Sequence, residues 1–289
     1  MSTYTTFTFP GSDGTPITAY RWDPQAAPKA ILQITHGVGE HALRYTEPAE
    51  RFAAEGFVVY AQDHRGHGAT AGSPEQFGQI GTDGWYALVA DIGALSAVAR
   101  RENPGLRLTL LSHSLGSFAT QQYLIDHSGD VDGVILTGTA AIDLLAPALD
   151  LDNPVGLDLF NAAFQPARTD FDWLSRDESM VDAYLADPRT GFNLDQDGLK
   201  AMFDGAAKAA TATDQVRSDL PLYIAVGAMD PVNGGLALLT ALEQRYRDAG
   251  LTNLTVVTYP EARHEILNET NRDEVLDAMV DWVHAQKLG

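Results

Sequence analysis

The sequence predicts an α/β protein in which a mostly parallel central sheet is flanked by helices and interrupted by a helical insertion. Short, almost continuously apolar segments alternate along the chain with segments whose apolar residues recur at helical spacing. This alternation favours right-handed crossovers between parallel strands. Between about residues 141 and 219 the alternation stops, and the remaining patterns are helical.

The first 140 residues contain the opening strands of the predicted sheet. Polar and apolar residues alternate on both sides of a turn at 11–14, which predicts an antiparallel hairpin. Leu88, Ile92 and Leu95 share one helical face, and a Pro-Gly pair at 104–105 ends that helix. The expected elements are strands over 5–9, 16–22 and 30–35, a helix over 47–55, a strand over 57–62, a helix over 83–101, a strand from 107 that turns into a helix at 112–116, and a strand over 131–137.

The insertion contains three expected helices, over 154–164, 178–186 and 194–211. The first is apolar on nearly every side, so it is either buried or faces an apolar ligand. We therefore expect a core domain formed by 1–140 and 220–289 and a helical cap, or lid, formed by 141–219. The core is expected to resume with a strand over 220–226, a helix over 236–247, a strand over 254–259 and a helix over 272–286.

The composition disfavours several classes of function. The 289-residue chain has a formal net charge of −20, which disfavours nucleic acid and electrostatic attachment to anionic lipid. It has no cysteine, which excludes disulfides, thiolate metal sites and cysteine nucleophiles. No segment approaches the roughly 18 consecutive apolar residues of a membrane span, so we expect at most transient contact with a membrane surface. The N-terminal residues do not resemble a signal peptide, and we expect a cytoplasmic protein. The acidic, lysine-poor composition indicates either adaptation to salt or a compositional habit of the source genome.

The turn at 112–116, Ser-His-Ser-Leu-Gly, is typical of a nucleophile elbow centred on Ser114. A serine hydroxyl is a poor nucleophile, and a sharp strand-to-helix turn holds it close to a general base and to donors for an oxyanion. Such a turn is strained and crowded, so the residues two positions before and after the nucleophile must be small. Gly116 meets this requirement, whereas Ser112 stands where a glycine is usual.

Three further strand ends carry glycine-rich or polar segments, at 36–38, at Asp230 and at His264. Because the carboxyl ends of parallel strands meet at one edge of a sheet, we expect these segments to lie near Ser114. The chain order of nucleophile, acid and histidine is that of the α/β-hydrolases rather than of chymotrypsin or subtilisin.

The expected roles follow from this order. Ser114 attacks an acyl carbonyl, His264 takes its proton and later gives it to the leaving alcohol, and Asp230 orients the histidine. The backbone N–H groups of Val38 and Leu115 are the expected oxyanion donors.

Some residues have other interpretations. Asp230 precedes a proline and is also a good helix-capping residue, and Asp143 and Asp150 are rival acids in or beside the insertion. Glu40 lies between two histidines, but the spacing matches no zinc motif. No metal site is expected, and structural roles are expected for His36, His41, His64, His67, His127 and His284.

The sequence resembles the bacterial lysophospholipase and monoacylglycerol lipase group of serine α/β-hydrolases over essentially its whole length. The segments that carry the resemblance are 36–45, 63–68, 112–116, 230–235 and 263–269, together with 173–177 and 187–188 of the insertion. The resemblance implies the α/β-hydrolase fold and cofactor-free hydrolysis of one fatty acyl ester of a lysophospholipid or monoacylglycerol. It also implies that Arg44 and His113 lie near the polar head-group side of the pocket. Carried onto matching positions, it gives the triad and oxyanion donors as Ser114, Asp230, His264, Val38 and Leu115.

Three functions remain open at this point. The first is hydrolysis of a single-chain lipid ester, with the apolar insertion, including Phe160 and Phe164, forming the acyl pocket. The second is a short-chain esterase or an acyltransferase on the same triad, and the third is a ligand-binding homologue without turnover. Epoxide and halide chemistry is not expected, because such relatives have an aspartate where this chain has Ser114. The expected partner is a small acyl ester, and the oligomeric state is not predicted.

Overall fold

A central eight-stranded sheet organises the chain, in a computed structural model that describes residues 3–289. Residues 1 and 2 of the predicted core lie outside the described residues. The strand order is β1-β2-β4-β3-β5-β6-β7-β8. The strands are β1 (Thr5–Pro10), β2 (Pro16–Trp22), β3 (Ala30–Thr35), β4 (Phe57–Gln62), β5 (Leu108–His113), β6 (Gly133–Thr137), β7 (Leu222–Gly227) and β8 (Leu254–Tyr259).

The pairing of these strands confirms the prediction of a mostly parallel sheet. β1 pairs with β2 and β2 pairs with β4 in antiparallel fashion, and all the following pairs are parallel. Every residue of β3, β4, β5 and β7 is buried, as expected for strands covered on both faces. This architecture, with helices on both faces, is that of an α/β-hydrolase.

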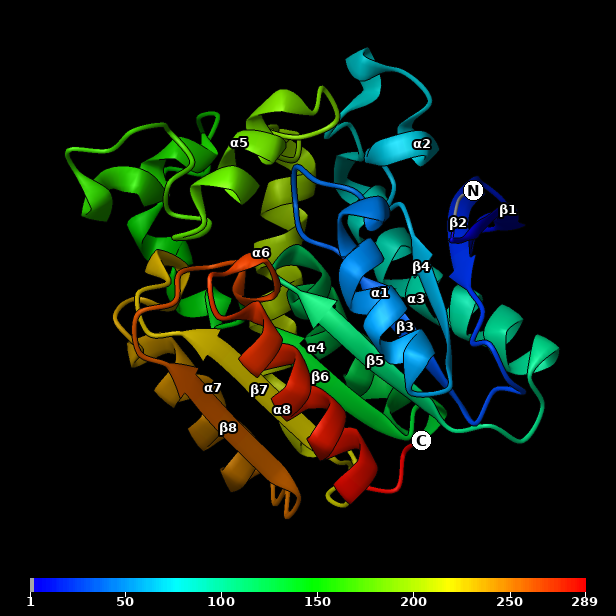
Figure 1. Cartoon of the computed structure of the whole chain (residues 1–289). Helices are drawn as coiled ribbons and strands as arrows, with labels where there is room; N and C mark the ends of the chain where they lie inside the picture. The colour runs from blue at the N-terminus through cyan, green and yellow to red at the C-terminus, as the bar shows by residue number, and fades with distance from the viewer. Residues whose placement is uncertain (1–2) are drawn as a thin grey trace.

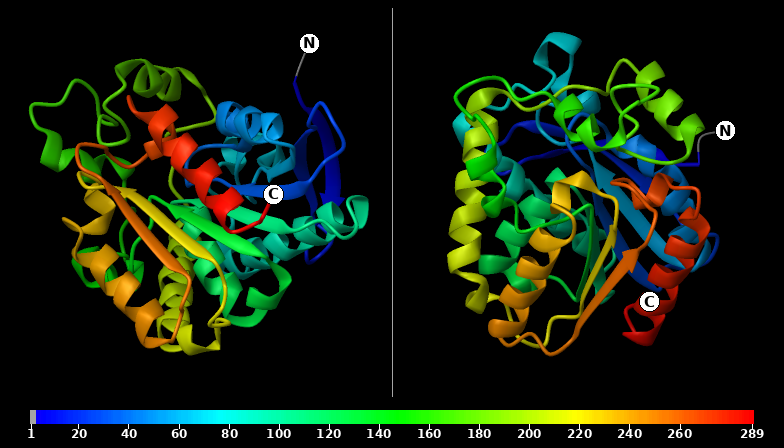
Figure 2. Two further views of the ribbon diagram at one scale, coloured as in Figure 1. Left: turned by 60° about the horizontal axis from the view of Figure 1, so that its bottom comes forward. Right: turned by 90° about the vertical axis from the view of Figure 1, so that its left-hand side faces the viewer.

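Two layers of helices cover the sheet (Figures 1 and 2). Buried residues of α1 and α8 form one hydrophobic cluster with one face of the sheet. Buried residues of α3, α4, α6 and α7 belong to the cluster on the other face. The helices of the core are α1 (Thr46–Ala54), α2 (Gly68–Ala71), α3 (Gly81–Glu102), α4 (Leu115–His127), α7 (Ala237–Asp248) and α8 (Arg272–Ala285).

The segment between β6 and β7 contains helices and no strand within the described residues, as its sequence pattern predicts. Its α-helices are α5 (Glu178–Ala186) and α6 (Gln196–Thr211), and α6 packs against α3 and α4. The expected helix over 154–164 differs: it begins at Leu157 and winds as a 3-10 helix, η6 (Leu157–Phe164). Gly156 before it is extended and no side chain caps the helix, so the helix does not begin at residue 154 as expected.

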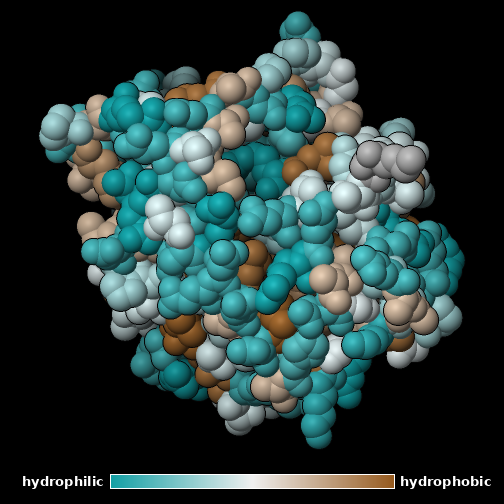
Figure 3. Space-filling view, in the orientation of Figure 1, coloured by the Kyte–Doolittle hydropathy of each residue, from teal (hydrophilic) through white to brown (hydrophobic). Residues whose placement is uncertain are grey.

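Short 3-10 turns complete the chain. Those used below are η1 (Ala42–Tyr45), η4 (Ile142–Leu144), η8 (Pro231–Asn233) and η9 (Ile266–Asn268). No helix in the described residues 3–289 combines the length and apolar character needed to cross a bilayer. The face drawn in Figure 3 is mostly hydrophilic, with hydrophobic residues in small patches, which agrees with the net charge of −20.

Candidate active site

Ser114 lies in the turn between β5 and α4, with φ of 49° and ψ of −119°. Positive φ is unusual for a residue with a side chain, and here it turns the chain sharply so that a helix begins at the next residue. Gly116 allows this turn, because a Cβ at that position would lie 2.5 Å from the carbonyl oxygen of Thr35. The backbone N–H of Ser114 donates to the carbonyl of Thr137, the last residue of β6, at 3.0 Å. The backbone geometry is therefore that of a nucleophile elbow.

Ser112, at the position where a glycine is usual, is fully buried. Its hydroxyl lies 2.8 Å from the hydroxyl of Thr120 on α4, and the two form a hydrogen bond. The serine side chain is thus accommodated by a polar partner on the helix that follows the turn.

Asp230 and His264 meet at the ends of β7 and β8. His264 Nδ1 lies 2.8 Å from Asp230 Oδ2, and both side chains are buried. The other oxygen of Asp230 accepts the backbone N–H of Val232 at 2.9 Å, so this carboxylate caps η8 and also orients the histidine. Burial by itself lowers the pKa of His264, but the charge and hydrogen bond of Asp230, together with the charges of Glu265 and Glu40, raise that pKa above its ordinary value.

The His264 ring lies beside the elbow. Its centroid is 4.8 Å from that of His113, the residue before Ser114, and 4.9 Å from that of Trp173 in the insertion. The hydrogen bonds of the described residues do not include one between Ser114 Oγ and His264 Nε2. In enzymes without bound substrate, catalytic hydrogen bonds are often long and tighten only when the substrate binds.

The two expected oxyanion donors are free. Neither the Val38 N–H nor the Leu115 N–H donates a hydrogen bond within the described chain. Leu115 is the first residue of α4, where N–H groups have no partner inside the helix. The loop that carries Val38 is fixed to the elbow, because the Gly116 N–H donates to the carbonyl of His36 at 3.1 Å.

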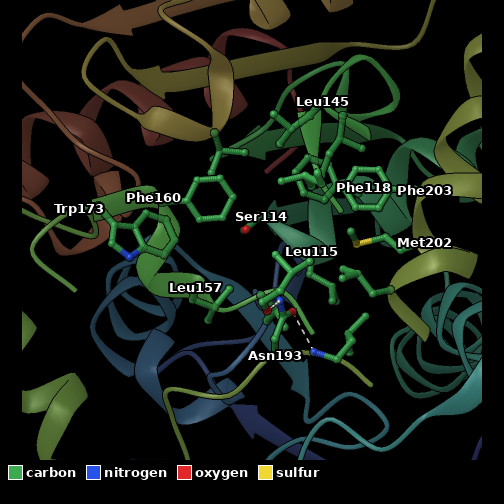
Figure 4. A pocket seen from close by; sticks show the side chains of 17 residues that line it. Ser114, Leu115, Phe118, Leu145, Leu157, Phe160, Trp173, Asn193, Met202 and Phe203 are labelled. Atoms are coloured by element: carbon green, nitrogen blue, oxygen red, sulfur yellow. Dashed lines mark hydrogen bonds between the residues drawn. The ribbon is translucent and has the colours of Figure 1, made fainter. Parts of the chain in front are cut away.

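An apolar cavity opens at Ser114 (Figure 4). Ser114 lies between Phe160 and Trp173 on one side and Phe118, Met202 and Phe203 on the other. No charged residue is among the described residues that line it, which are Val38, Ser114, Leu115, Phe118, Ile142, Leu145, Leu149, Val155, Leu157, Phe160, Trp173, Asn193, Leu194, Leu199, Met202, Phe203 and Val232.

Of the four expected substrate contacts, Phe160 lines this cavity, and Phe164, Arg44 and His113 are not among its lining residues. The Phe164 ring lies 4.4 Å from the guanidinium carbon of Arg263. His113 is buried in the elbow beside His264, and its Nδ1 lies 2.9 Å from the hydroxyl of Thr137.

Arg44 is enclosed by two carboxylates that the sequence analysis did not assign to the site. It donates to Glu40 Oε2 at 2.6 Å and, through both Nη atoms, to Glu265 at 2.6 and 2.7 Å. Burial raises the pKa of Glu265, but the charge of Arg44 outweighs it and lowers that pKa to about 2. The only signal in the sequence for these two carboxylates was their position. Glu40 lies close to Val38, and Glu265 directly follows His264.

The rival residues have partners elsewhere. Asp143 forms a two-pronged salt bridge with Arg245, and Asp150 accepts from Asn153. Three of the remaining histidines pack together under the loops that follow β3 and β4, with centroid distances of 4.2 and 5.2 Å from the ring of His36 to those of His64 and His67. The others each pair with a carboxylate: His41 with Asp187, His127 with Asp130, and His284 with Glu55.

The fold defines the class of this protein as an α/β-hydrolase. A family model described as serine aminopeptidase, S33, matches residues 26–271, and the chain belongs to this family. It is 29% identical over 287 residues to the monoacylglycerol lipase of Mycolicibacterium smegmatis, with 98% of each chain covered. Human monoglyceride lipase is 28% identical over 220 residues, which cover 73% of this chain and 66% of the human one. A thermostable carboxyl esterase from Bacillus coagulans superposes with a TM-score of 0.87 at 26% identity, with 99% of each chain covered. The chain is accordingly a serine hydrolase of the lipase and esterase type, as the sequence resemblance implied.

Proposed function

We propose that this protein hydrolyses the single acyl ester of a monoacylglycerol through an acyl-enzyme intermediate. The observation that carries the proposal is the apolar, uncharged cavity that opens at Ser114, next to the buried pair of Asp230 and His264. An apolar cavity excludes water from a fatty acyl chain and binds it without specific polar contacts.

In the proposed reaction, Ser114 Oγ attacks the ester carbonyl carbon while His264 Nε2 takes the hydroxyl proton. The carbonyl oxygen becomes an oxyanion, which the N–H groups of Val38 and Leu115 stabilise. His264 then returns the proton to the leaving glycerol oxygen, and the acyl group stays on Ser114. A water molecule attacks this ester, again through His264, and releases the fatty acid. Asp230 holds the histidine and stabilises its charged form in both steps.

The segment 141–219 is proposed to act as the cap that encloses the acyl chain. Its residues Leu157, Phe160 and Trp173 line the cavity on one side, and Met202 and Phe203 of α6 line it on the other. Strand ends of the core supply the reacting groups, and most of the residues that line the cavity belong to the cap, so the cap supplies most of the acyl specificity. An acyl chain seated there gains about 0.8 kcal/mol for each methylene group buried.

The charges near the site favour glycerol over a phosphate-bearing head group. Arg44, which would otherwise be free to bind a phosphate, is already paired with Glu40 and Glu265. The other arginine beside His264, Arg263, donates to the backbone oxygens of Asp172 and Ser175. A phosphate would therefore meet an arginine that two carboxylates already neutralise, and those carboxylates would repel it. An uncharged glycerol meets no such repulsion.

The test compares two substrates with the same acyl chain, 1-decanoylglycerol and 1-decanoyl lysophosphatidylcholine. We expect kcat/KM to be at least about tenfold higher for the glycerol ester, which is ~1.4 kcal/mol of differential transition-state binding. Equal or faster turnover of the phospholipid would contradict the proposed head group. Ser114→Ala is the control, and residual turnover at the wild-type rate would contradict the proposed nucleophile.

A further inference from the structure

Arg44 joins two loops that approach the reacting atoms from opposite ends of the chain. Glu40 belongs to the loop after β3 that carries Val38, and Glu265 directly follows His264. The guanidinium donates to both carboxylates at 2.6 to 2.7 Å, and all three side chains are largely buried, with exposed fractions of 12% for Arg44, 3% for Glu40 and 6% for Glu265. Such charge-assisted contacts are short and directional, so they hold the two loops at a fixed separation.

Glu40 connects Arg44 to the backbone of the oxyanion loop. Its Oε1 accepts the backbone N–H of Gly37 at 2.5 Å and the hydroxyl of Tyr45 at 2.8 Å, while its Oε2 accepts from Arg44. The Gly37 N–H belongs to the His36–Gly37 peptide, which directly precedes the peptide that carries the Val38 N–H. Because both carboxylate oxygens accept hydrogen bonds, an amide in this place would turn an NH₂ group toward at least one donor.

Glu265 connects Arg44 to the histidine loop in the same way. Its two oxygens accept from the two Nη atoms of Arg44, and Oε2 also accepts from Asn268 at 2.8 Å. Its backbone N–H donates to the carbonyl of Leu174 in the insertion at 2.8 Å. The residue that follows His264 is thus held from its side chain and from its backbone.

The insertion adds a contact to the same loop. The hydroxyl of Tyr184 on α5 donates to the carbonyl of Gly39 at 2.8 Å, and the Arg44 guanidinium lies 4.8 Å from the centre of the Tyr184 ring. Tyr184, Arg44 and Glu40 therefore restrain the residues on both sides of Val38.

We propose that Glu40, Arg44 and Glu265 form a positioning bridge, which sets the distance between the oxyanion donor Val38 N–H and the base His264. This inference rests on the catalytic roles proposed above for Val38 and His264, but not on the identity of the head group. The bridge residues act through the loops they hold, and they contact no reacting atom. A displacement of about 1 Å in such a constellation costs as much as 10²-fold in rate.

The experiment uses the full-length protein and p-nitrophenyl butyrate, an ester that needs no glycerol head group. The test variant is Glu40→Gln, and the matched control is Asp91→Asn on α3. Asp91 is also fully buried and accepts from an arginine, Arg65, at 2.6 and 3.1 Å and from the backbone N–H of Ser12 at 2.7 Å. Both substitutions replace a buried carboxylate, which accepts from an arginine and a backbone N–H, by an amide, but only one lies in the bridge.

We expect Glu40→Gln to lower kcat by about tenfold or more with KM changed less than about threefold, since one oxyanion donor is worth 10²–10³ in rate where measured. A trifluoromethyl ketone inhibitor forms a tetrahedral adduct with a serine, and its Ki should rise by the same factor as kcat falls. Asp91→Asn should lower the melting temperature comparably and leave kcat and Ki within about twofold of wild type. These values would support positioning, because lost stability alone leaves a folded enzyme's Ki unchanged.

Three outcomes would overturn the bridge: wild-type kcat and Ki in Glu40→Gln, a raised KM with unchanged kcat, or equal losses of kcat in Glu40→Gln and Asp91→Asn. If Glu40→Gln does not fold, Tyr45→Phe removes a single donor to Glu40, and the bridge then requires a drop in kcat of about threefold with unchanged KM. A fully active Ser114→Ala would instead refute the proposed nucleophile, so the two failures are distinguishable.

Discussion

Replacing Ser112 by alanine removes the hydrogen-bond partner of the buried Thr120 hydroxyl. The two oxygens are 2.8 Å apart and both residues are fully buried, so water cannot replace the lost partner. A net hydrogen bond contributes about 1 kcal/mol, and a stranded buried hydroxyl costs ~1–3 kcal/mol. We therefore expect Ser112→Ala to lower the free energy of unfolding by about 2 kcal/mol. Ser112→Gly should cost ~0.5–1 kcal/mol more, because glycine is unfavourable inside a strand.

A double-mutant cycle separates the hydrogen bond from other effects of the substitutions. Thr120→Val should cost about as much as Ser112→Ala, while the double variant should cost much less than their sum, with a coupling energy of at least about 1 kcal/mol. Urea unfolding at equilibrium measures all three. Thr109→Val is the control, because the Thr109 hydroxyl is buried in the same strand and has no hydrogen-bond partner among the described residues, so its removal should be neutral or stabilising.

Catalysis should survive these changes. The Ser112 hydroxyl points to α4, and the backbone of the elbow is held independently by Gly116. We expect kcat of Ser112→Ala and Ser112→Gly to stay within about threefold of wild type. Additive costs in the cycle would refute the hydrogen-bond account, and a loss of turnover as complete as that of Ser114→Ala would refute the assignment of roles at the elbow.

Three further predictions follow from the pKa directions and the cavity. Because the pKa of His264 is raised and the base must be neutral, kcat/KM for an uncharged ester should fall on the acid side with an apparent pKa above the ordinary ~6.5 of histidine. An apparent pKa below about 6 would contradict this prediction. Asp230→Asn should lower both the apparent pKa and kcat. Burial lowers the pKa of His64 to about 3 and that of His67 to about 4, so both stay neutral in the folded protein while the unfolded chain takes up protons below about pH 6.5. The stability that the neutral histidines allow is therefore complete above that pH and is lost as the pH falls. Between about pH 7 and 5 each histidine lowers the free energy of unfolding by about 2 kcal/mol, and His67→Gln should reduce this loss, measured by urea unfolding, by that amount. An unchanged pH dependence in His67→Gln would contradict the prediction. Met202→Trp should fill part of the cavity and lower kcat/KM for p-nitrophenyl octanoate at least about tenfold more than for the acetate. Met202→Leu should leave the ratio of the two kcat/KM values near that of wild type. A uniform loss on both esters in Met202→Trp would contradict an acyl chain at this position.

Much of the fold could be predicted because its signals are local. Polar–apolar alternation, continuous apolar segments and helical spacing predicted all eight strands of the sheet and the longer helices to within a few residues. The elbow was recognisable because a strained turn admits few residues, and Gly116 remained at the position where a Cβ has no room. The apolar segment 154–164 was misjudged in its winding, since periodicity predicts which residues face together but not whether the first turn can be capped.

In the site, too, the sequence predicted some features and packing decided others. The chain order of Ser114, Asp230 and His264 is written in the sequence, because parallel strands bring their carboxyl ends to one edge whatever the packing above them. Packing decided three other features of the site. It brings Asp230 to 2.8 Å from His264, and it places Phe160 in the cavity lining but Phe164 against Arg263. It also gives Ser112 a hydrogen-bond partner in Thr120.

The clearest contrast is at Arg44. The sequence by itself determined the strands, the elbow and the order of the expected triad, since these depend on backbone conformations that neighbouring residues impose. Only the tertiary structure decided that Arg44 is enclosed by Glu40 and by Glu265, which is 221 positions away. A contact over such a separation leaves no periodic trace in the sequence, because it is formed when the sheet brings distant loops together and burial then requires each charge to have a partner.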